Sequence, residues 1–388
     1  MTKQEIYFDN SATTPVLPQV AELVSRVMLE DWGNPAALYG RGLAAERLLK
    51  EARGRVAAAI QARPEEIIFT SGGTEANNLA LRGVMQSRAG RGRHLLISAV
   101  EHPAVMRTAE ALAQAGFEPE LVPVDGEGLV SLSELRRRLR PDTQLVSIML
   151  VNNEVGAIEP LGEAAKILRE AKSPALLHTD AVQAFGKMPI DVGRLGVDLL
   201  SASGHKLHAP KGVGFLYVRR GLKFAPILTG GGQEGGWRSG TENMPGICGL
   251  GLAAKLAADN LAERRRRVEM VRERLLAGLA GLAGWQQNGP REPAQALSNV
   301  LSLSFAGVRS EVLLHMLESE GLLVSSGSAC SNIHKDKLSP VLLAMKLPRE
   351  QIEGALRLSF SYLNTPEEAA QAAGIICRCV EELRKILG

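Results

Sequence analysis

Hydrophobic positions in the first two thirds of the chain follow two alternating patterns. Short apolar runs, partly β-branched, predict buried strands at residues 66–70, 95–100, 144–151, 175–178 and 197–201. Longer stretches with helical periodicity lie between them, at residues 44–61, 103–115 and 161–171. This alternation predicts the α/β class, with a mostly parallel sheet and helices on both of its faces.

The pattern changes after Gly246. A single long helix is predicted over residues 247–282, followed by a loop at residues 288–295. A smaller α+β section then follows, with strands at 299–305, 322–324 and 355–360, a helix at 310–320 and a closing helix from Pro366. We therefore place a domain boundary near residue 260, inside the long helix.

Composition excludes several classes of protein. The 388 residues include 45 Lys and Arg against 42 Asp and Glu, and aromatic residues make up 4%. A near-neutral charge gives no reason to expect direct DNA binding or a membrane-surface protein, and scarce aromatics disfavour a platform for single-stranded nucleic acid. No apolar run approaches the roughly 18 residues that span a bilayer, and the first residues lack a secretory pattern, so we expect a cytoplasmic protein.

Four cysteines, at positions 248, 330, 377 and 379, are too few for a disulfide scaffold in a chain of this length. Cys377 and Cys379 are two apart on a predicted helix, which does not suit a structural zinc site, and no metal is expected. Cys330 differs, because it lies in a small, polar loop (SSGSACS). Such a loop suits a nucleophilic thiolate, although an unimportant loop cysteine is an equally open interpretation.

A possible phosphate-binding turn follows the first predicted strand, in the segment TSGGTEANN (residues 70–78). Glycines let the backbone approach an anion, and the start of a helix offers free N–H groups. Gly73 and Thr74 are the candidate contacts. Alternatively, Thr74 is only the N-cap of the helix.

Two charged residues lie at the ends of later strands. Lys206, in SASGHK (residues 201–206), can be desolvated, which would suit a Schiff base with an aldehyde cofactor. Asp180, in HTDAVQ (residues 178–183), is costly to bury without a positive partner, and the protonated pyridine of pyridoxal phosphate (PLP) is such a partner. A surface lysine and a helix-capping aspartate remain the alternatives.

Together these segments resemble cysteine desulfurases of the NifS and IscS group, in the class V aminotransferase superfamily. The resemblance covers nearly the whole chain. Its further landmarks are residues 7–15 (YFDNSATTP), 33–35 (GNP), 101–102 (EH), 152–156 (NNEVG), 230–243 (GGGQEGGWRSGTEN) and 357–359 (RLS).

The resemblance implies a role for each matching residue. Catalytic roles fall on Lys206, Cys330, His102 and Asp180. Cofactor-binding roles fall on Gly73, Thr74, His102, Asn153, Asp180, Gln183, Ser203, His205, Lys206 and Thr241, with Thr241 reaching in from the other subunit. Substrate-binding roles fall on Asn34, Asn153 and Arg357, and the guanidinium fork of an arginine suits a carboxylate.

The resemblance also implies the architecture. We expect a fold-type I PLP enzyme with a seven-stranded, mostly parallel sheet in a large domain, residues 16–260. Residues 1–15 and 261–388 would form a small α+β domain that carries the cysteine loop, about residues 325–338. The family is homodimeric.

The implied reaction converts L-cysteine to L-alanine and leaves a persulfide on Cys330, for delivery to an acceptor such as an iron–sulfur scaffold or a thiolation pathway. The alternatives are a selenocysteine lyase, another PLP-dependent β-eliminating enzyme, or a sulfur-relay platform that acts by docking a partner. Docking would use the arginine clusters at residues 136–138 and 264–267 together. A solvated helix face is the simpler interpretation of each cluster.

Some positions depart from the usual pattern of the family. They are Ala36 and Ala37, Tyr39, Gly204, residues 361–363 (SYL) and the charged stretch after Cys330. None removes a catalytic group. His334, four residues after Cys330, is interpreted as an ordinary loop histidine.

Overall fold

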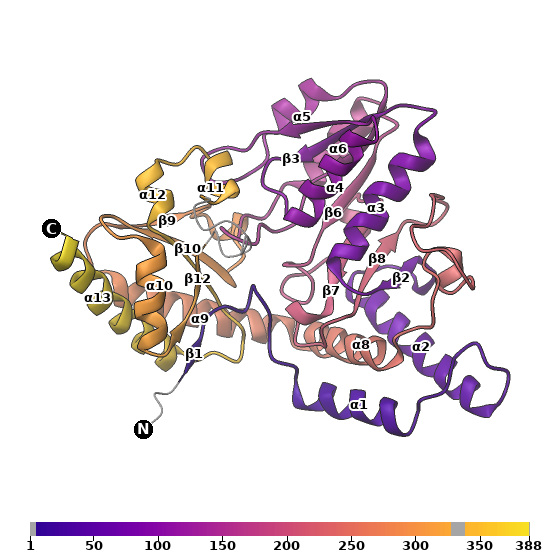
Figure 1. Cartoon of the computed structure of the whole chain (residues 1–388), viewed down its shortest axis with the longest axis horizontal. Coiled ribbons are helices and arrows are strands. Elements are labelled where there is room, and N and C mark those ends of the chain that lie inside the picture. Colours follow the sequence, from indigo (N-terminus) through magenta and orange to yellow (C-terminus); the bar gives the residue numbers. More distant parts are fainter. Residues whose placement is uncertain (1–4, 327–337, 388) are drawn as a thin grey trace.

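The computed structural model describes residues 5–326 and 338–387, and Figure 1 shows their arrangement. Its largest sheet has seven strands in the order β2-β8-β7-β6-β5-β3-β4. These are β2 (Ile67–Thr70), β3 (His94–Ser98), β4 (Glu118–Val122), β5 (Thr143–Ser147), β6 (Leu176–Asp180), β7 (Leu199–Ser203) and β8 (Gly214–Val218). Within this sheet β8 is antiparallel to both neighbours and all other pairs are parallel, so the predicted mostly parallel sheet is confirmed.

Helices cover both faces of this sheet because its strands are apolar on both sides. In β3, Leu95 and Ile97 join the hydrophobic cluster on one face, whereas Leu96 joins the cluster on the other. The first face is covered by α3 (Gly73–Arg88) and α4 (Pro103–Gln114). The remaining helices before residue 260 are α1 (Pro18–Leu29), α2 (Gly40–Ala59), α5 (Leu132–Arg138), α6 (Leu161–Glu170), α7 (Val192–Leu195) and α8 (Met244–Asp259).

The predicted long helix over residues 247–282 is interrupted. The structure has α8 and then α9 (Leu261–Leu279), with Asn260 between them at φ −121° and ψ 18°. The Asn260 side chain donates to the carbonyl of Leu256, and such bonds let asparagine compete with regular helix hydrogen bonding. The break falls where we predicted the domain boundary, and the assignment of two domains stays a prediction.

The C-terminal part forms its own hydrophobic cluster around a four-stranded antiparallel sheet. Its strand order is β12 (Ser325–Ser326), β13 (Ala355–Ser359), β10 (Val300–Phe305) and β9 (Trp285–Asn288). The helices here are α9, α10 (Ser310–Ser319), α11 (Pro340–Ala344), α12 (Arg349–Glu353) and α13 (Pro366–Leu387). A separate short parallel pair joins β1 (Ile6–Tyr7) to β11 (Leu322–Leu323).

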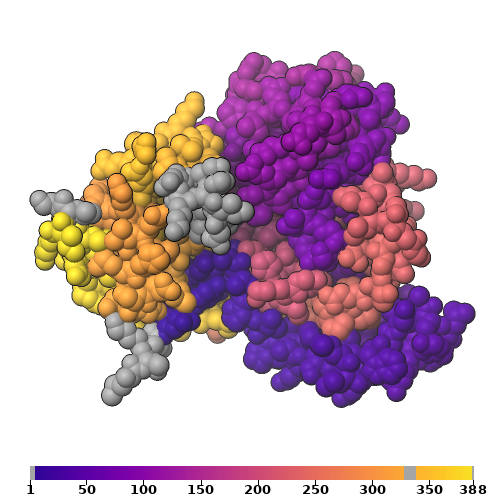
Figure 2. Space-filling model, viewed as in Figure 1, coloured from indigo at the N-terminus to yellow at the C-terminus, as the bar shows by residue number. Residues whose placement is uncertain are grey.

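The N-terminal segment, residues 8–15, crosses between the two parts. On one side, the Ser11 backbone N–H donates to Oγ of Ser359 at 2.7 Å. On the other, the Thr14 hydroxyl donates to the carbonyl of His205 at 2.9 Å. Figure 2 shows the first described residues, in indigo, between the orange C-terminal part and the large-sheet part. This segment therefore ties the C-terminal sheet to the turn that contains Lys206.

The described parts of the chain contain neither a membrane-spanning helix nor a metal-binding cluster. Among residues 5–326 and 338–387, no helix is both long and apolar enough to cross a lipid bilayer. The same residues contain no group of three or more His, Cys, Asp or Glu side chains that would hold a metal ion.

Glu159 generates a prediction about stability. Its Oε2 accepts a hydrogen bond from the Val130 N–H at 2.8 Å, and burial raises the pKa of this carboxyl to about 8. The folded protein therefore holds a proton that the unfolded chain releases above its lower pKa, so Glu159 costs stability progressively from about pH 4.5 to pH 8.

We compare the free energies of unfolding of Glu159→Gln and the wild type at pH 5 and at pH 9. The difference in favour of Glu159→Gln should be larger at pH 9 by at least about 1 kcal/mol, since one pKa unit corresponds to about 1.36 kcal/mol. Urea unfolding at both pH values measures the gain. Glu127→Gln, at an exposed position, is the control. A gain that is equal at both pH values would contradict the buried, protonated carboxyl.

Candidate functional site

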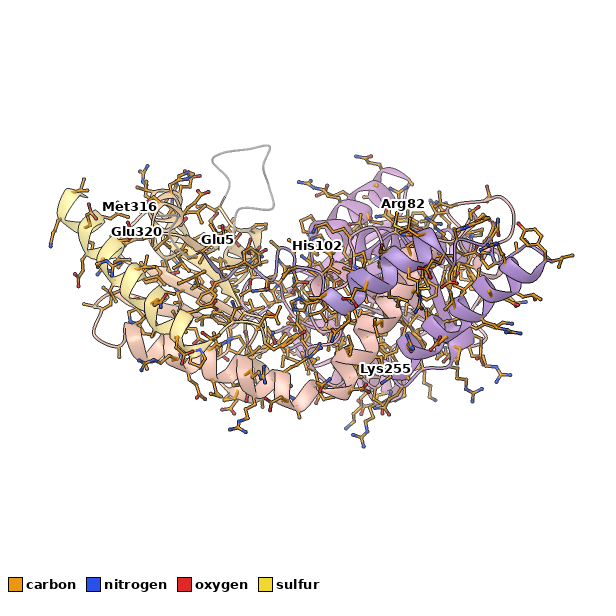
Figure 3. The ribbon with its side chains drawn as sticks, turned by 90° about the horizontal axis from the view of Figure 1, so that it is seen from below. Glu5, Arg82, His102, Lys255, Met316 and Glu320 are labelled. Carbon is orange, nitrogen blue, oxygen red and sulfur yellow. The ribbon has the colours of Figure 1, made fainter. Side chains whose placement is uncertain are left out.

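Most of the predicted site residues line one cavity of about 320 Å³. It lies at the carboxyl ends of strands, where ligands of open α/β sheets bind: Asp180 ends β6 and Ser203 ends β7. Of the predicted residues, Gly73, Thr74, His102, Asn153, Asp180, Gln183, Ser203, His205, Lys206 and Arg357 line it. Figure 3 labels His102 near the middle of the molecule, between the C-terminal part and the large sheet.

Asp180 is a buried carboxylate, with 4% of its surface exposed. Its Oδ2 accepts from the Asn77 side-chain amide at 2.6 Å, and its Oδ1 accepts from the Val182 N–H at 2.9 Å. Within the described residues it forms no ion pair. A buried carboxylate is costly unless it meets a positive charge, so this side of the cavity suits a cationic group.

Lys206 reaches the same cavity from the short 3₁₀ turn Gly204–Lys206 that follows β7. Its ammonium donates to the backbone carbonyl of Ala12 at 2.7 Å and also to that of Ser11. A Cβ on Gly204 would lie 3.1 Å from Val213 and 3.2 Å from the Pro210 carbonyl, so this close turn suits glycine. The partly buried Lys206 is thus not an ordinary surface lysine.

The start of α3 has the features of an anion cradle. Its N-cap is Gly72 and not Thr74, so the alternative in which Thr74 caps the helix is wrong. A Cβ on Gly73 would come within 2.6 Å of the Val182 side chain, which explains the glycine at this close approach. The free N–H groups of the first turn and the exposed Thr74 hydroxyl then face a region that Ser203 and His205 also line.

His205 contributes as a neutral imidazole. Burial lowers its pKa to about 4, and the nearby charges of Lys206, Lys211 and Lys187 act in the same direction. Its Nδ1 lies 3.2 Å from the Thr13 hydroxyl. At neutral pH this side chain can offer a hydrogen bond without carrying a charge.

Arg357, on β13, lines the cavity and is buried, with 4% of its surface exposed. One terminal nitrogen donates to the carbonyl of Asn153 at 3.2 Å, and the other pairs with Asp9 at 2.9 Å. The guanidinium is thus held through both terminal nitrogens, and its buried Nε–H is a donor without a partner among the described atoms.

Two of the predicted residues that the structure describes, Asn34 and Thr241, do not line the cavity. Asn34 is exposed, and its side chain accepts from the Ala36 N–H at 2.9 Å. Thr241 is exposed on the segment before α8, which is fixed by the ion pairs Arg53–Glu234 and Arg238–Glu75. Cys330 lies outside the described residues, as does His334.

The cavity also has lining residues that we did not predict: Ser11, Ala12, Asn77, Met149 and Val182. Asn77 had a signal, because it is four residues after Gly73 on the helix and so shares its face. The carbonyls of Ser11 and Ala12 had none, because backbone groups leave no mark on composition or spacing.

His102 is both the N-cap of α4 and a residue of the cavity. Its Nδ1 accepts the backbone N–H of Ala104 at 3.1 Å, so Nδ1 carries no proton and the neutral ring is protonated at Nε2. Burial lowers the pKa of His102, against the opposing effect of Asp180, and the helix N-terminus also disfavours a positive charge there.

We therefore expect His102 to remain the neutral Nε2–H tautomer at pH 6.5 and above. Nitrogen-15 NMR of the imidazoles measures the tautomer, and the spectrum of His102→Gln assigns the signal. A protonated Nδ1 at neutral pH, in either the other tautomer or the imidazolium, would contradict the capping geometry.

Comparisons with known proteins agree with this geometry. The model of the family "Aminotransferase class-V" matches residues 6–371. A cysteine desulfurase IscS from Methanosarcina thermophila is 43% identical over 98% of this chain and 93% of its own length. A solved NifS-like protein is 38% identical with a TM-score of 0.90, covering 99% of each chain. The structure titled "SspA in complex with cysteine" is 32% identical with a TM-score of 0.80, covering 92% of this chain and 99% of that one.

These matches extend over nearly the whole chain, and the identities are well above the level at which only a fold is shared. They confirm the resemblance that the sequence motifs indicated, together with the fold-type I architecture. The family is generally PLP-dependent. This chain therefore belongs to the aminotransferase class-V family, among relatives that are cysteine desulfurases of the IscS and NifS type.

Proposed function

We propose that this protein is a PLP-dependent cysteine desulfurase. The observation that carries the proposal is the buried Asp180 carboxylate, which has no cationic partner among the described residues and shares one cavity with Lys206. The cationic pyridine ring of PLP would supply the missing charge, and its aldehyde would meet the amine. Full-length relatives that are cysteine desulfurases support the choice of reaction.

Each group of PLP has matching residues in the cavity. The N-terminus of α3 with Gly73, Thr74, Ser203 and His205 suits the phosphate. Asp180 suits the ring nitrogen, and Gln183 is a donor for the phenolic oxygen. His102, as a neutral imidazole, can stack on the ring, and Asn153 is a further proposed contact of the cofactor. When bound, PLP supplies an electron sink for the bonds at the substrate α-carbon.

The protein's own groups would then handle the substrate. Arg357 would hold the carboxylate of L-cysteine, with Asn153 as a further contact. Asn34 does not line this cavity, so its proposed substrate contact rests on the resemblance alone. The Lys206 amine would move the α-proton. The Cys330 thiolate would attack the substrate sulfur, so that a sulfur–sulfur bond forms as the carbon–sulfur bond breaks. L-Cysteine and the enzyme thiol thus become L-alanine and an enzyme persulfide, with atoms and electrons balanced.

The flanks of the cysteine segment support this role for Cys330. Before it, Ser325 pairs with Arg357 in the sheet of the C-terminal part. After it, the Ser339 hydroxyl donates to Glu154 at 2.5 Å, beside Asn153. Cys330 follows Ser326 by four residues, which span at most about 14 Å of chain. Both ends therefore start close to residues that line the cavity.

A sulfur acceptor follows from the persulfide, and we propose a protein acceptor such as an iron–sulfur scaffold. The two arginine clusters do not form a shared docking surface for it. Figure 1 shows α5 at the top of the molecule and α9 in its lower half. On α5, residues 136–138 are all ion-paired with glutamates, and on α9 Arg264 stacks 4.0 Å from the Tyr362 ring.

We further propose a homodimer in which Thr241 completes the phosphate site of the partner subunit. Exposed apolar side chains occur together around the end of α1 and the start of α2, at Met28, Leu29, Trp32, Leu38, Tyr39 and Leu43. Such clustering is typical of an interaction surface. Thr241 does not line its own cavity, and the ion pairs of its segment hold it in an outward position.

The reaction has a direct test. With PLP, L-cysteine and a thiol reductant, we expect equal amounts of L-alanine and sulfide. Cys330→Ala should bind PLP with unchanged colour, form no persulfide and lose at least about a hundredfold in turnover. Cys377→Ala, at a partly buried cysteine on α13, is the matched control and should behave as the wild type.

If the wild-type protein binds PLP yet releases no alanine from L-cysteine, the desulfurase proposal is wrong. Turnover of L-selenocysteine alone, independent of Cys330, would instead assign the protein as a selenocysteine lyase.

Mixed dimers test the position of Thr241. Thr241→Ala should weaken PLP binding by about three- to tenfold, the range of one hydrogen bond. In a mixed dimer of Thr241→Ala and Lys206→Ala subunits, the only site with a lysine receives its threonine from the other subunit. We expect that site to hold PLP as tightly as the wild type. Binding as weak as in the Thr241→Ala homodimer would show that Thr241 acts in its own subunit.

A further inference from the structure

Gln183 is held at both ends of its side-chain amide. Its Oε1 accepts a hydrogen bond from the Lys187 ammonium at 3.0 Å. Its Nε2 donates to the backbone carbonyl of Ser11, also at 3.0 Å. The residue is 5% exposed and lines the large cavity. The amide therefore has its oxygen turned to Lys187, with one N–H bonded to Ser11 and the other uncommitted.

Lys187 is an amine in a place that is unfavourable for a positive charge. It lies in the turn after β6, four residues after Gln183. Burial, together with the smaller effects of the nearby charges of Lys206 and Arg357, lowers its pKa to about 7. No carboxylate pairs with it in the part of the chain that the structure describes. Methionine or leucine would fill the position without the desolvation cost of a buried charge, which indicates that the amine has a role other than packing.

Lys187 does not line the large cavity. It lines a separate small cavity of about 30 Å³, together with His208 and Arg264. Lys206 lines both cavities and so lies between them. Lys187 thus has no direct access to a ligand in the large cavity, and its side-chain hydrogen bond to Gln183 is its connection to the site.

We infer that Lys187 is a positioning residue, which fixes the orientation of the Gln183 amide so that its NH₂ group faces the cofactor. An ammonium group has donors and no acceptor, so only the oxygen of the amide can face it. The positive charge at that oxygen also polarises the amide and strengthens its N–H as a donor. The inference rests on the proposed function, because it concerns the contact between Gln183 and the phenolic oxygen of PLP.

The consequence concerns the electronic state of bound PLP. With PLP bound, a donor at the phenolic oxygen would withdraw negative charge from it, which would make the nearby Lys206 nitrogen harder to protonate. The visible absorption band of bound PLP changes with pH. Loss of the donor should therefore raise the pH at which half of this change has occurred. Without Lys187 the amide can rotate, and its N–H becomes a weaker donor.

The variants for the test are Lys187→Met, Gln183→Leu and their combination, all as full-length protein. Lys166→Met, at an exposed lysine on α6, is the matched control. Three quantities are measured for each: the melting temperature of the cofactor-free protein, the dissociation constant for PLP, and the pH midpoint of the visible band.

We expect Lys187→Met to melt no lower than the wild type, to bind PLP about three- to tenfold more weakly, and to raise the midpoint by about half a unit to one unit. Gln183→Leu should match it, and the double variant should add little to Gln183→Leu alone, because Lys187 acts through Gln183. Lys166→Met should equal the wild type.

Two results would overturn the inference. One is a Lys187→Met protein with wild-type affinity and midpoint while Gln183→Leu is altered. The other is full additivity in the double variant, which would show that the charge of Lys187 acts on the cofactor without Gln183. A wild type that takes up no PLP would instead overturn the proposed function itself, so the two failures are distinguishable.

Discussion

The site depends on the carboxylate of Asp180, which is buried at the end of a central strand and forms no ion pair with any described residue. Asn77 and the Val182 N–H supply hydrogen bonds to it but no charge. The electrostatic cost is accepted in the folded protein because a cationic ligand offsets it when bound. The same negative charge raises the pKa of the fully buried Glu101, after the larger effect of burial, and opposes the lowering at His102.

The N-terminal segment, residues 8–15, connects the site residues of the large sheet to those of the C-terminal sheet. Asp9 pairs with Arg357 from the C-terminal sheet, while the carbonyls of Ser11 and Ala12 accept from Lys206. Ser11 also accepts from Gln183. One short stretch thus contacts groups proposed for substrate, lysine and cofactor binding, so a change in its position would disturb all three together.

The sequence predicts the sheet and most of the cavity because both rest on local signals. Apolar runs indicate the central strands, and glycine, lysine or aspartate at a strand end indicates the chemistry. Among the strands that the pattern did not predict are β4, whose positions are mostly not buried, and β9, which is polar. The helix break at Asn260 coincides with one side-chain hydrogen bond, which no apolar pattern signals. Lys187 looks ordinary in sequence, because only the fold brings its charge beside Lys206.

A crystal structure of the protein with PLP tests the central claim most directly. It should show the cofactor joined to the Lys206 amine, with the pyridine nitrogen about 2.7–2.9 Å from a carboxylate oxygen of Asp180, the range of a charge-assisted bond. A ring turned so that its nitrogen lies away from Asp180, or a cofactor attached to Lys187, would contradict the account.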